Sequence, residues 1–510
     1  MSTSGYTPSV RGEPIHARLV RLTHAQWENS VRDLLQLDAP SGLSESFEGD
    51  PPRGTFGNNE RSLEVTSTLW GDYQRAAEAL AEAAAADASR RASILGGASD
   101  ATQFVQQFGL KVYRRPLSAE QVQAYVQLYE RGATFFPDLD AQVAGFRVVV
   151  EAMLQSPHFV YRSELNDAGG RLDSYEVASK LSFLLRNTTP DSELLEAANS
   201  DAFRSAATVK EWAERLLDEA GMNEVMASYN TTLFGTHRYE WIIKDTGVFP
   251  EFDTEKSPDL RQDTELFLAH IFEDDLGVRE LLTSTTGFIN ETTAALYGVP
   301  APAGESFART ELGPERPGLF TRVGFLAYNG TNTQPDPIHR GVDLNHRMLC
   351  VNLVAPPGEL PQLPPFEPNQ TNRERVSAAT EAEGTACASC HATVINPLGF
   401  AFENYDAIGR YRTTDNGRPV DASGSYQFAT GLEQFNGAAE LAELMAQNPQ
   451  VHACYTKHLA EFVLGRDLDQ ADSGLVTNMM DQSLASASIK DLILTIVQSD
   501  AFLTRQEVTP

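Results

Sequence analysis

The sequence predicts a mainly α protein made of several helical domains, with at most a small β-hairpin. Helix-start signals recur along the chain, and each is followed by apolar residues at a helical period. Strand-like runs are few. The 510 residues exceed what one simple core supports, so we expect several packed units.

Four capping patterns mark expected helix starts. A Ser, Thr or Asp at the cap is followed three residues later by Gln or Glu, which satisfies the first backbone N–H groups. The patterns are Thr23–Gln26, Ser118–Gln121, Asp173–Glu176 and Thr208–Glu211. The Ala-rich stretch from Tyr73 to Ala86 favours a helix by composition alone. Strand candidates are limited to Val323–Leu326, Arg418–Val420 and Tyr426–Ala429.

Gly- and Pro-rich stretches interrupt the helical pattern at Pro40–Ser62, at Pro300–Pro317 and in a polyproline-like spacer, Ala355–Asn369. Together with the helix pattern they predict five domains. These are an N-terminal helical domain over 1–98 with the long loop 40–62, a helical domain over 99–168, a large helical domain over 169–316, a fourth domain over 317–435 and a C-terminal helical domain over 436–510.

Composition narrows the class of partner. The net charge of −30 argues against nucleic acid, because phosphates require a basic footprint. A protein partner is expected to have a basic docking face. No apolar run approaches the roughly 20 residues needed to cross a bilayer, so we expect no membrane span in this chain.

The strongest motif lies in the fourth domain. Cys387-Ala-Ser-Cys390-His391 has the C-x-x-C-H pattern of covalent haem c attachment. Two thiols add across the porphyrin vinyl groups, and the adjacent imidazole binds iron from one face. We therefore expect one covalent haem c on Cys387 and Cys390, with His391 as the proximal ligand. The expected fold is then multi-helical domains followed by a cytochrome c-like haem module.

Alternatives to haem stay open at this point. Cys454 and His458, four residues apart on a predicted helix, could complete a zinc site with Cys387 and Cys390. A redox pair of the thioredoxin kind needs a βαβ setting, which this pattern does not predict.

The second axial position of the iron has several candidates. Met445 follows His391 at a separation that suits a Met-ligated small cytochrome, although a Met on an amphipathic helix also suits core filling. An open position is a further alternative. The other candidate side chains are Met479, Met480, His339, His346, His452 and His458.

Three further segments have possible roles at the haem or at a metal. Arg410 and Arg412 suit the haem propionates, with surface arginines on a turn as the alternative. The segment Asn396–Gly399 predicts a tight turn whose carbonyls accept the second ring N–H of His391. The loop Gly54–Asn59 suits tight turns, with Ca²⁺ binding through its side-chain oxygens as the alternative.

If haem takes the middle pair, Cys350 and Cys454 remain. An even remainder predicts one disulfide in an oxidising compartment, with two unrelated buried thiols as the alternative.

Because haem c is attached outside the cytoplasm, we expect a periplasmic or cell-surface location. The opening stretch, Met1–Pro14, lacks the apolar region of a signal peptide, so we expect a leader to have been removed.

The run INPLGFAFENYDAIGRYRTTDNGRPVDASG, residues 395–424, resembles a multidomain family of exported proteins. This family was first recognised in planctomycetes as cytochrome c-associated domains of unknown function. Other stretches resemble its remaining domains, among them RLTHAQWENSVRDLL, KVYRRPLSAEQVQAYVQLY, YEVASKLSFLLRNTTPDSELL and CYTKHLAEFVLGRDLD. The resemblance implies an extracytoplasmic, mostly helical, mono-haem protein. It also places cysteines at Cys350 and Cys454, which supports their pairing.

Three functions follow from a haem in this setting. The first is single-electron transfer to or from a protein partner. The second is a haem-dependent oxidoreductase of the peroxidase or oxygenase kind, with a substrate pocket at the haem. The third is a binding or scaffold protein with a structural haem. No G-x-S-x-G, H-E-x-x-H or P-loop signature is found, so catalytic residues are not assigned.

Overall fold

The computed structural model describes residues 6, 8–10, 17–51, 54–165, 170–303, 306–354 and 363–505. The fold is mainly α, and in these ranges the β-structure consists of four two-stranded antiparallel sheets. The spacer predicted at Ala355–Asn369 lies outside the described residues over 355–362, as does most of Met1–Pro14. The chain divides into two compact units.

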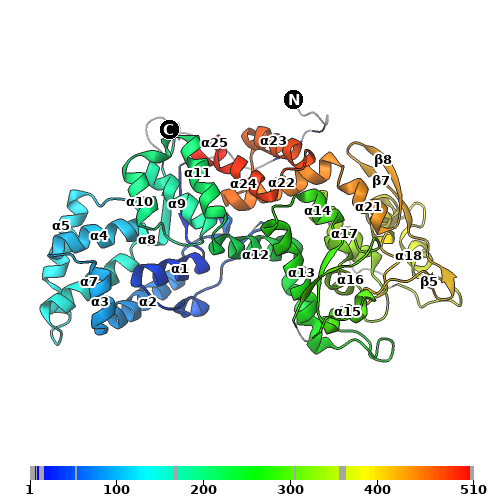
Figure 1. Ribbon diagram of the computed structural model, residues 1–510, viewed down its shortest axis with the longest axis horizontal. Coiled ribbons are helices and arrows are strands. Elements are labelled where there is room, and N and C mark those ends of the chain that lie inside the picture. The colour runs from blue at the N-terminus through cyan, green and yellow to red at the C-terminus, as the bar shows by residue number, and fades with distance from the viewer. Residues whose placement is uncertain are drawn as a thin grey trace. The chain divides into compact units, whose positions relative to one another are not determined.

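One unit comprises Arg11–Val225, Glu461–Ala471 and Leu494–Pro510. Its buried core includes Trp27, Tyr73, Phe104 and Phe146, and helices α2 and α7 pack against each other within it. Its elements are β1 (Arg18–Arg21), α1 (His24–Leu35), α2 (Ser67–Ala86), α3 (Ala88–Leu95), α4 (Ala101–Tyr113), α5 (Ala119–Glu130), α6 (Gly132–Phe135), α7 (Ala141–Leu154), α8 (Pro157–Val160), β2 (Tyr161–Glu164), α9 (Ser174–Leu185), α10 (Ser192–Asn199), α11 (Ala206–Leu217) and α25 (Asp500–Leu503) (Figure 1).

The other unit comprises Met1–Val10, Met226–Ala460 and Asp472–Ile493, and it contains the C-x-x-C-H motif. Its elements are α13 (Ser257–Glu273), α14 (Val278–Thr283), β3 (Thr286–Ile289), α15 (Glu291–Tyr297), β4 (Ala308–Glu311), α16 (Val323–Tyr328), α17 (Pro337–Met348), α18 (Asn372–Thr380), α19 (Ala386–Cys390), the π-helical turn η7 (His391–Ile395), α20 (Asn396–Phe400), β5 (Thr414–Asp415), β6 (Arg418–Pro419), β7 (Ser423–Phe428), β8 (Gly431–Asn436), α21 (Ala438–Met445) and α23 (Ser473–Leu484). Three helices have residues in both units: α12 (Ala220–Phe234), α22 (Pro449–Leu464) and α24 (Ile489–Val497).

Three of the four predicted helix starts lie where the capping patterns place them. Thr23, Ser118 and Asp173 each cap a helix through a capping box. The fourth start is wrong by three residues, because Ser205 caps α11 and accepts a hydrogen bond from the backbone N–H of Thr208. A serine cap satisfies an early N–H group as well as the expected threonine would.

The strand predictions are partly wrong. The predicted runs 418–420 and 426–429 overlap the strands 418–419 and 423–428, but Val323–Leu326 lies within helix α16, where Arg322 precedes the first turn. Four apolar residues in a row do not distinguish a buried strand from a buried helix turn. The β1–β2 and β3–β4 pairs were not predicted, since each strand has only four residues.

Helix α17 packs against η7 and α20, the two elements that follow the motif cysteines. At Gly341, a Cβ atom would lie 2.1 Å from the carbonyl oxygen of Ile395, and at Gly399 it would lie 1.8 Å from that of Pro337. Both positions therefore require glycine for close backbone approach. The buried guanidinium of Arg340 adds hydrogen bonds to the carbonyls of Phe402 and Leu326, at 2.9 Å each. These contacts hold the backbone of the segment 395–402 against α17.

Candidate functional site

The two cysteines of the motif lie on a short surface helix. Thr385 begins α19 by accepting a hydrogen bond from the backbone N–H of Ala388, at 3.2 Å. Cys387 and Cys390 are three residues apart, which places them on one face of the helix. Cys390 is exposed, Cys387 is half-buried, and neither sulfur is in a disulfide. The segment therefore presents two free thiols on the same side.

A π-helical turn follows the cysteines. The wide turn covers His391–Ile395, and Asn345 of α17 donates a 2.9 Å hydrogen bond to the carbonyl of Val394. The hydroxyl of Tyr426 donates to the side-chain oxygen of Asn345, at 2.7 Å, and so fixes the direction of that amide. Such wide turns are rare and frequently occur at functional sites.

His391 is held in one orientation by Asn396. The distance from His391 Nδ1 to Asn396 Oδ1 is 2.9 Å. The amide nitrogen of Asn396 donates to Thr380 Oγ1 at 2.9 Å and to Glu381 Oε1 at 2.7 Å, so its oxygen is the atom that faces the ring. The ring must then donate from Nδ1, which leaves the lone pair on Nε2. This is the tautomer that an Nε2 metal ligand requires.

The acceptor differs from the one that the sequence predicts. The expected tight turn at Asn396–Gly399 is instead helix α20, which has Pro397 in its first turn. A proline at the start of a helix costs no hydrogen bond, because that N–H is unpaired in any case. The partner of His391 is the side chain of Asn396, which is fully buried, and not a backbone carbonyl.

Arg410 and Arg412 follow the motif, and both guanidinium groups bind carboxylates of the protein. Arg410 Nε lies 2.8 Å from Asp406, and its Nη1 pairs with Glu251. Arg412 pairs with Asp415 at 2.6 Å and with Glu403 at 3.1 Å. Their role at the haem propionates stays a prediction.

Glu403 is the most perturbed acid of this segment. It is 2% exposed, and this burial raises its pKa to about 7 although Arg412 and Arg340 oppose the shift. Asn372 also donates to its carboxylate, at 3.3 Å. Through Asn372, the buried carboxylate of Glu403 links the first residue of α18 to the segment that follows α20.

Met445 lies in the core. Its side chain is 1% exposed at the end of α21, a helix that packs against α14 and β8. His452 uses both ring nitrogens, at 2.7 Å from Ser483 Oγ and 3.0 Å from the carbonyl of Ala446. The second axial ligand of a haem, Met445 included, stays a prediction.

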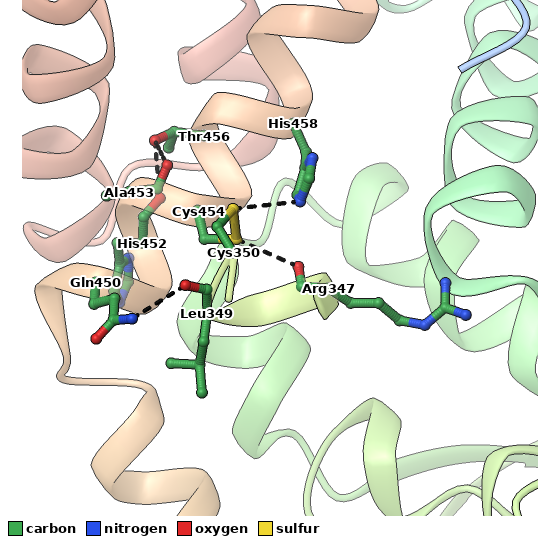
Figure 2. The surroundings of a disulfide bond; sticks show 9 residues. All are labelled: Arg347, Leu349, Cys350, Gln450, His452, Ala453, Cys454, Thr456 and His458. Carbon is green, nitrogen blue, oxygen red and sulfur yellow. Dashed lines mark hydrogen bonds between the residues drawn. A yellow bond between two sulfur atoms is a disulfide. The ribbon is translucent and has the colours of Figure 1, made fainter. Parts of the chain in front are cut away.

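Cys350 and Cys454 form a disulfide with their Cα atoms 5.5 Å apart. His458 lies one helical turn after Cys454 on α22, and its Nε2 is 3.5 Å from Cys350 Sγ (Figure 2). The sulfur of Cys454 is bonded to the sulfur of Cys350, so it is not free to bind zinc together with Cys387, Cys390 and His458. The alternative prediction of this four-residue zinc site is therefore wrong for the disulfide-bonded protein.

The loop Gly54–Asn59 uses its asparagines as turn and capping residues. Asn59 accepts a hydrogen bond from the backbone N–H of Arg61 at 3.0 Å, and donates to Asp467 at 2.8 Å. Asn58 donates to the carbonyl of Phe462 at 2.7 Å. These contacts give the asparagines a structural role, and Ca²⁺ binding stays untested.

Sequence reasoning missed the side chains that support His391. Asn345, Asn396, Thr380 and Glu381 come from three different helices or their ends, and no local pattern links them. The only available signal is the five-residue spacing from His391 to Asn396, which matches a π-helical turn and not an α-helical one.

No helix in the described ranges combines the length and apolarity that a bilayer crossing demands.

Five family profiles match the chain, and each is described as a protein of unknown function. In chain order they are DUF1587 at residues 21–86, DUF1595 at 100–164, DUF1592 at 172–299, DUF1588 at 316–415 and DUF1585 at 432–502. The DUF1588 match carries the short name PSCyt3 and contains the C-x-x-C-H motif. No curated protein and no solved structure shows a significant match. With all five domains present, the chain belongs to the planctomycete-type cytochrome c-associated multidomain family, whose domains are of unknown function.

Proposed function

We propose that this chain is an extracytoplasmic mono-haem c-type cytochrome that passes single electrons to or from a protein partner. One observation carries the proposal: two free thiols and a tautomer-fixed histidine share one surface segment. Cys387 and Cys390 would anchor the haem, and His391 would bind the iron.

The donor set fits haem c chemically. Thioether formation needs two unpaired thiols, and the sulfurs of Cys387 and Cys390 are unpaired. Among the described residues, Nε2 of His391 has no hydrogen-bond partner, while its Nδ1 is committed to Asn396. When bound, haem c supplies a one-electron redox centre. The protein would anchor the haem through Cys387 and Cys390, orient the imidazole of His391 and hold the proton on its Nδ1.

Exposure of the motif favours a carrier. Ala386, Ser389, Cys390, Ala392 and Thr393 are exposed, so a group held there lies within reach of a second protein. The net charge of −30 would steer a basic partner toward the chain, because opposite charges raise the rate of encounter. The disulfide and the family membership support an extracytoplasmic location.

A cavity beside the motif favours a second candidate, a haem-dependent oxidoreductase. Its volume is about 450 Å³, within the range of small-molecule sites. Polar and aromatic side chains line it, and Ala392 directly follows the proximal histidine. The lining includes Arg373, Glu381, Ala392, Phe400, Ser423 and Gln434.

Ligand binding and salt dependence separate the two functions. For a carrier we expect the reduced, haem-loaded protein to bind CO slowly or not at all. Its electron exchange with a basic small cytochrome should slow as ionic strength rises. Exchange with ferricyanide, an anion, is the matched control and should accelerate with salt, because screening weakens its repulsion by the acidic protein. Rapid CO binding, or peroxide turnover far above that of free haem, would establish the oxidoreductase instead.

A further inference from the structure

We propose that Cys350, Cys454 and His458 form a redox-gated zinc site. Reduction of the disulfide would release two thiols which, with Nε2 of His458, bind one Zn²⁺. The proposal concerns the pair of cysteines that the haem motif does not use, and it does not rest on the proposed function.

The three donor atoms are already gathered in the oxidised protein. One ligand atom from each residue lies within 4.8 Å of the other two. Cys350 Sγ and His458 Nε2 are 3.5 Å apart, and the ring points its Nε2 toward the disulfide (Figure 2).

The distances suit tetrahedral zinc. Zn–S bonds of about 2.3 Å and Zn–N bonds of about 2.0–2.1 Å place sulfur and nitrogen about 3.6 Å apart, and two sulfurs about 3.8 Å apart. The separation from sulfur to nitrogen is 3.5 Å before any metal binds. The two sulfurs must separate, from 2.05 Å in the disulfide. Cys454 Sγ lies within 4.8 Å of the histidine nitrogen, and rotation about the side-chain bonds can bring these atoms to the tetrahedral separations.

The backbone around the three residues is held by contacts that do not involve sulfur. Cys454 and His458 are four residues apart on α22, so they share one face of a helix. Gln450 of the same helix donates a 3.1 Å hydrogen bond to the carbonyl of Leu349, directly before Cys350. Arg347 pairs with Asp343 at 3.2 Å. The donor atoms should therefore stay together when the disulfide opens.

The chemistry balances with a dithiol as the reductant. A thiolate of the dithiol attacks the disulfide to form a mixed disulfide, and its second thiol then closes the dithiol into its own disulfide. Two electrons and two protons pass to Cys350 and Cys454, which become thiols. Zinc binding then displaces the two thiol protons. Cys350 is exposed, which leaves the fourth coordination position open to water.

Zinc is the metal that this donor set favours. Two thiolates and one imidazole are borderline-soft ligands, as in catalytic and structural zinc centres, and hard cations such as Ca²⁺ prefer oxygen. The site would join the segment 316–415 to the segment 432–502, so the same three residues can link these segments through either a disulfide or a metal ion.

The test uses a full-length chain with Cys387→Ser and Cys390→Ser, so that the motif thiols cannot bind metal. After reduction and removal of the reductant under argon, Zn²⁺ affinity is measured by competition with a chromophoric chelator. We expect one Zn²⁺ per reduced chain and none at this site in the oxidised chain. His458→Gln should weaken binding by more than about 100-fold, because loss of a ligand exceeds the 10–100-fold cost of losing its outer partner. His237→Ala, which changes an exposed histidine outside this cluster, is the matched control and should leave affinity unchanged.

A second measurement covers a variant that fails to fold. In the reduced chain with intact His458, Zn²⁺ should slow alkylation of Cys350 and Cys454, as read by peptide mass spectrometry, and a chelator should restore the rate. Equal zinc binding by oxidised and reduced chains would overturn the proposal, as would unchanged affinity in a folded His458→Gln variant. Because this chain cannot attach haem, either result leaves the proposed electron carrier untouched.

Discussion

The two cysteine pairs of this chain have opposite environments. Cys350 and Cys454 are 104 residues apart in sequence, yet the fold brings them together and closes them as a disulfide. Cys387 and Cys390 are neighbours on one helix, and both sulfurs are free at or near the surface. Proximity in sequence therefore does not decide which cysteines pair. The pair that two distant segments bring together forms a disulfide, and the pair on a surface helix stays unpaired.

The histidine beside each pair sharpens this contrast. His458 turns Nε2 toward a sulfur, at 3.5 Å. His391 commits its Nδ1 to Asn396, at 2.9 Å, and keeps Nε2 for another partner. One imidazole is directed at a disulfide, while the other is oriented by a buried amide through its Nδ1.

The largest expected effect separates the two pairs by their covalent chemistry. Replacing Cys387 and Cys390 by serine should abolish covalent haem in exported protein, because no thiol remains to form a thioether. Replacing Cys350 and Cys454 by serine should leave one haem per chain. Intact-mass spectrometry measures both. Equal haem content in the two double variants would remove the distinction between the pairs.

The next effect concerns stability. The Cys350→Ser/Cys454→Ser variant should unfold more easily by about 4–5 kcal/mol, the chain-entropy value for a closed loop of about 100 residues. Urea denaturation followed by tryptophan fluorescence and circular dichroism is the measurement. The Cys387→Ser/Cys390→Ser variant is the control and should match the unsubstituted haem-free chain, since these thiols close no loop.

A smaller effect tests the orientation of His391. In the haem-free chain above pH 8, the wild-type ring should carry its proton on Nδ1. Asn396→Ala should shift the tautomer ratio toward Nε2–H by about tenfold, because it removes a hydrogen bond worth about 1–1.5 kcal/mol. Nitrogen-15 NMR of histidine-labelled protein reports the ratio. Asn404→Ala is the control, since Asn404 donates to the carbonyl of Arg412 and not to the ring. An unchanged ratio in Asn396→Ala would contradict the positioning role.

The smallest effect comes from His452, which is buried and bonds through both ring nitrogens. Burial lowers its pKa below the ordinary value of 6.5 although the carbonyl of Ala446 opposes the shift. As pH falls below about 6.5, the unfolded chain binds a proton that the folded chain resists, so stability decreases. His452→Gln should flatten the stability profile between pH 7 and pH 5. A slope that is the same in both proteins would exclude His452 as its source.

The helical fold could be predicted because caps and periodicity are local. The capping boxes that begin at Thr23, Ser118 and Asp173 each span only four residues, so they can be recognised in the sequence. The motif cysteines were equally visible, since the C-x-x-C-H pattern is contiguous. The support of His391 was not, because Asn345 and Thr380 reach it from other helices through tertiary packing. The proximity of His458 to Cys350 is likewise a consequence of the fold, as α22 and the end of α17 are far apart in sequence.

The central claim is that Cys387, Cys390 and His391 hold a single covalent haem. The chain should be expressed with an export leader in a bacterium that matures c-type cytochromes, then purified, denatured and examined as the pyridine haemochrome in alkali. The account predicts one haem c per chain, with both thiols converted to thioethers in the peptide that contains the motif. Exported, folded protein whose Cys387 and Cys390 remain free or bind zinc, with no covalent haem, would contradict it.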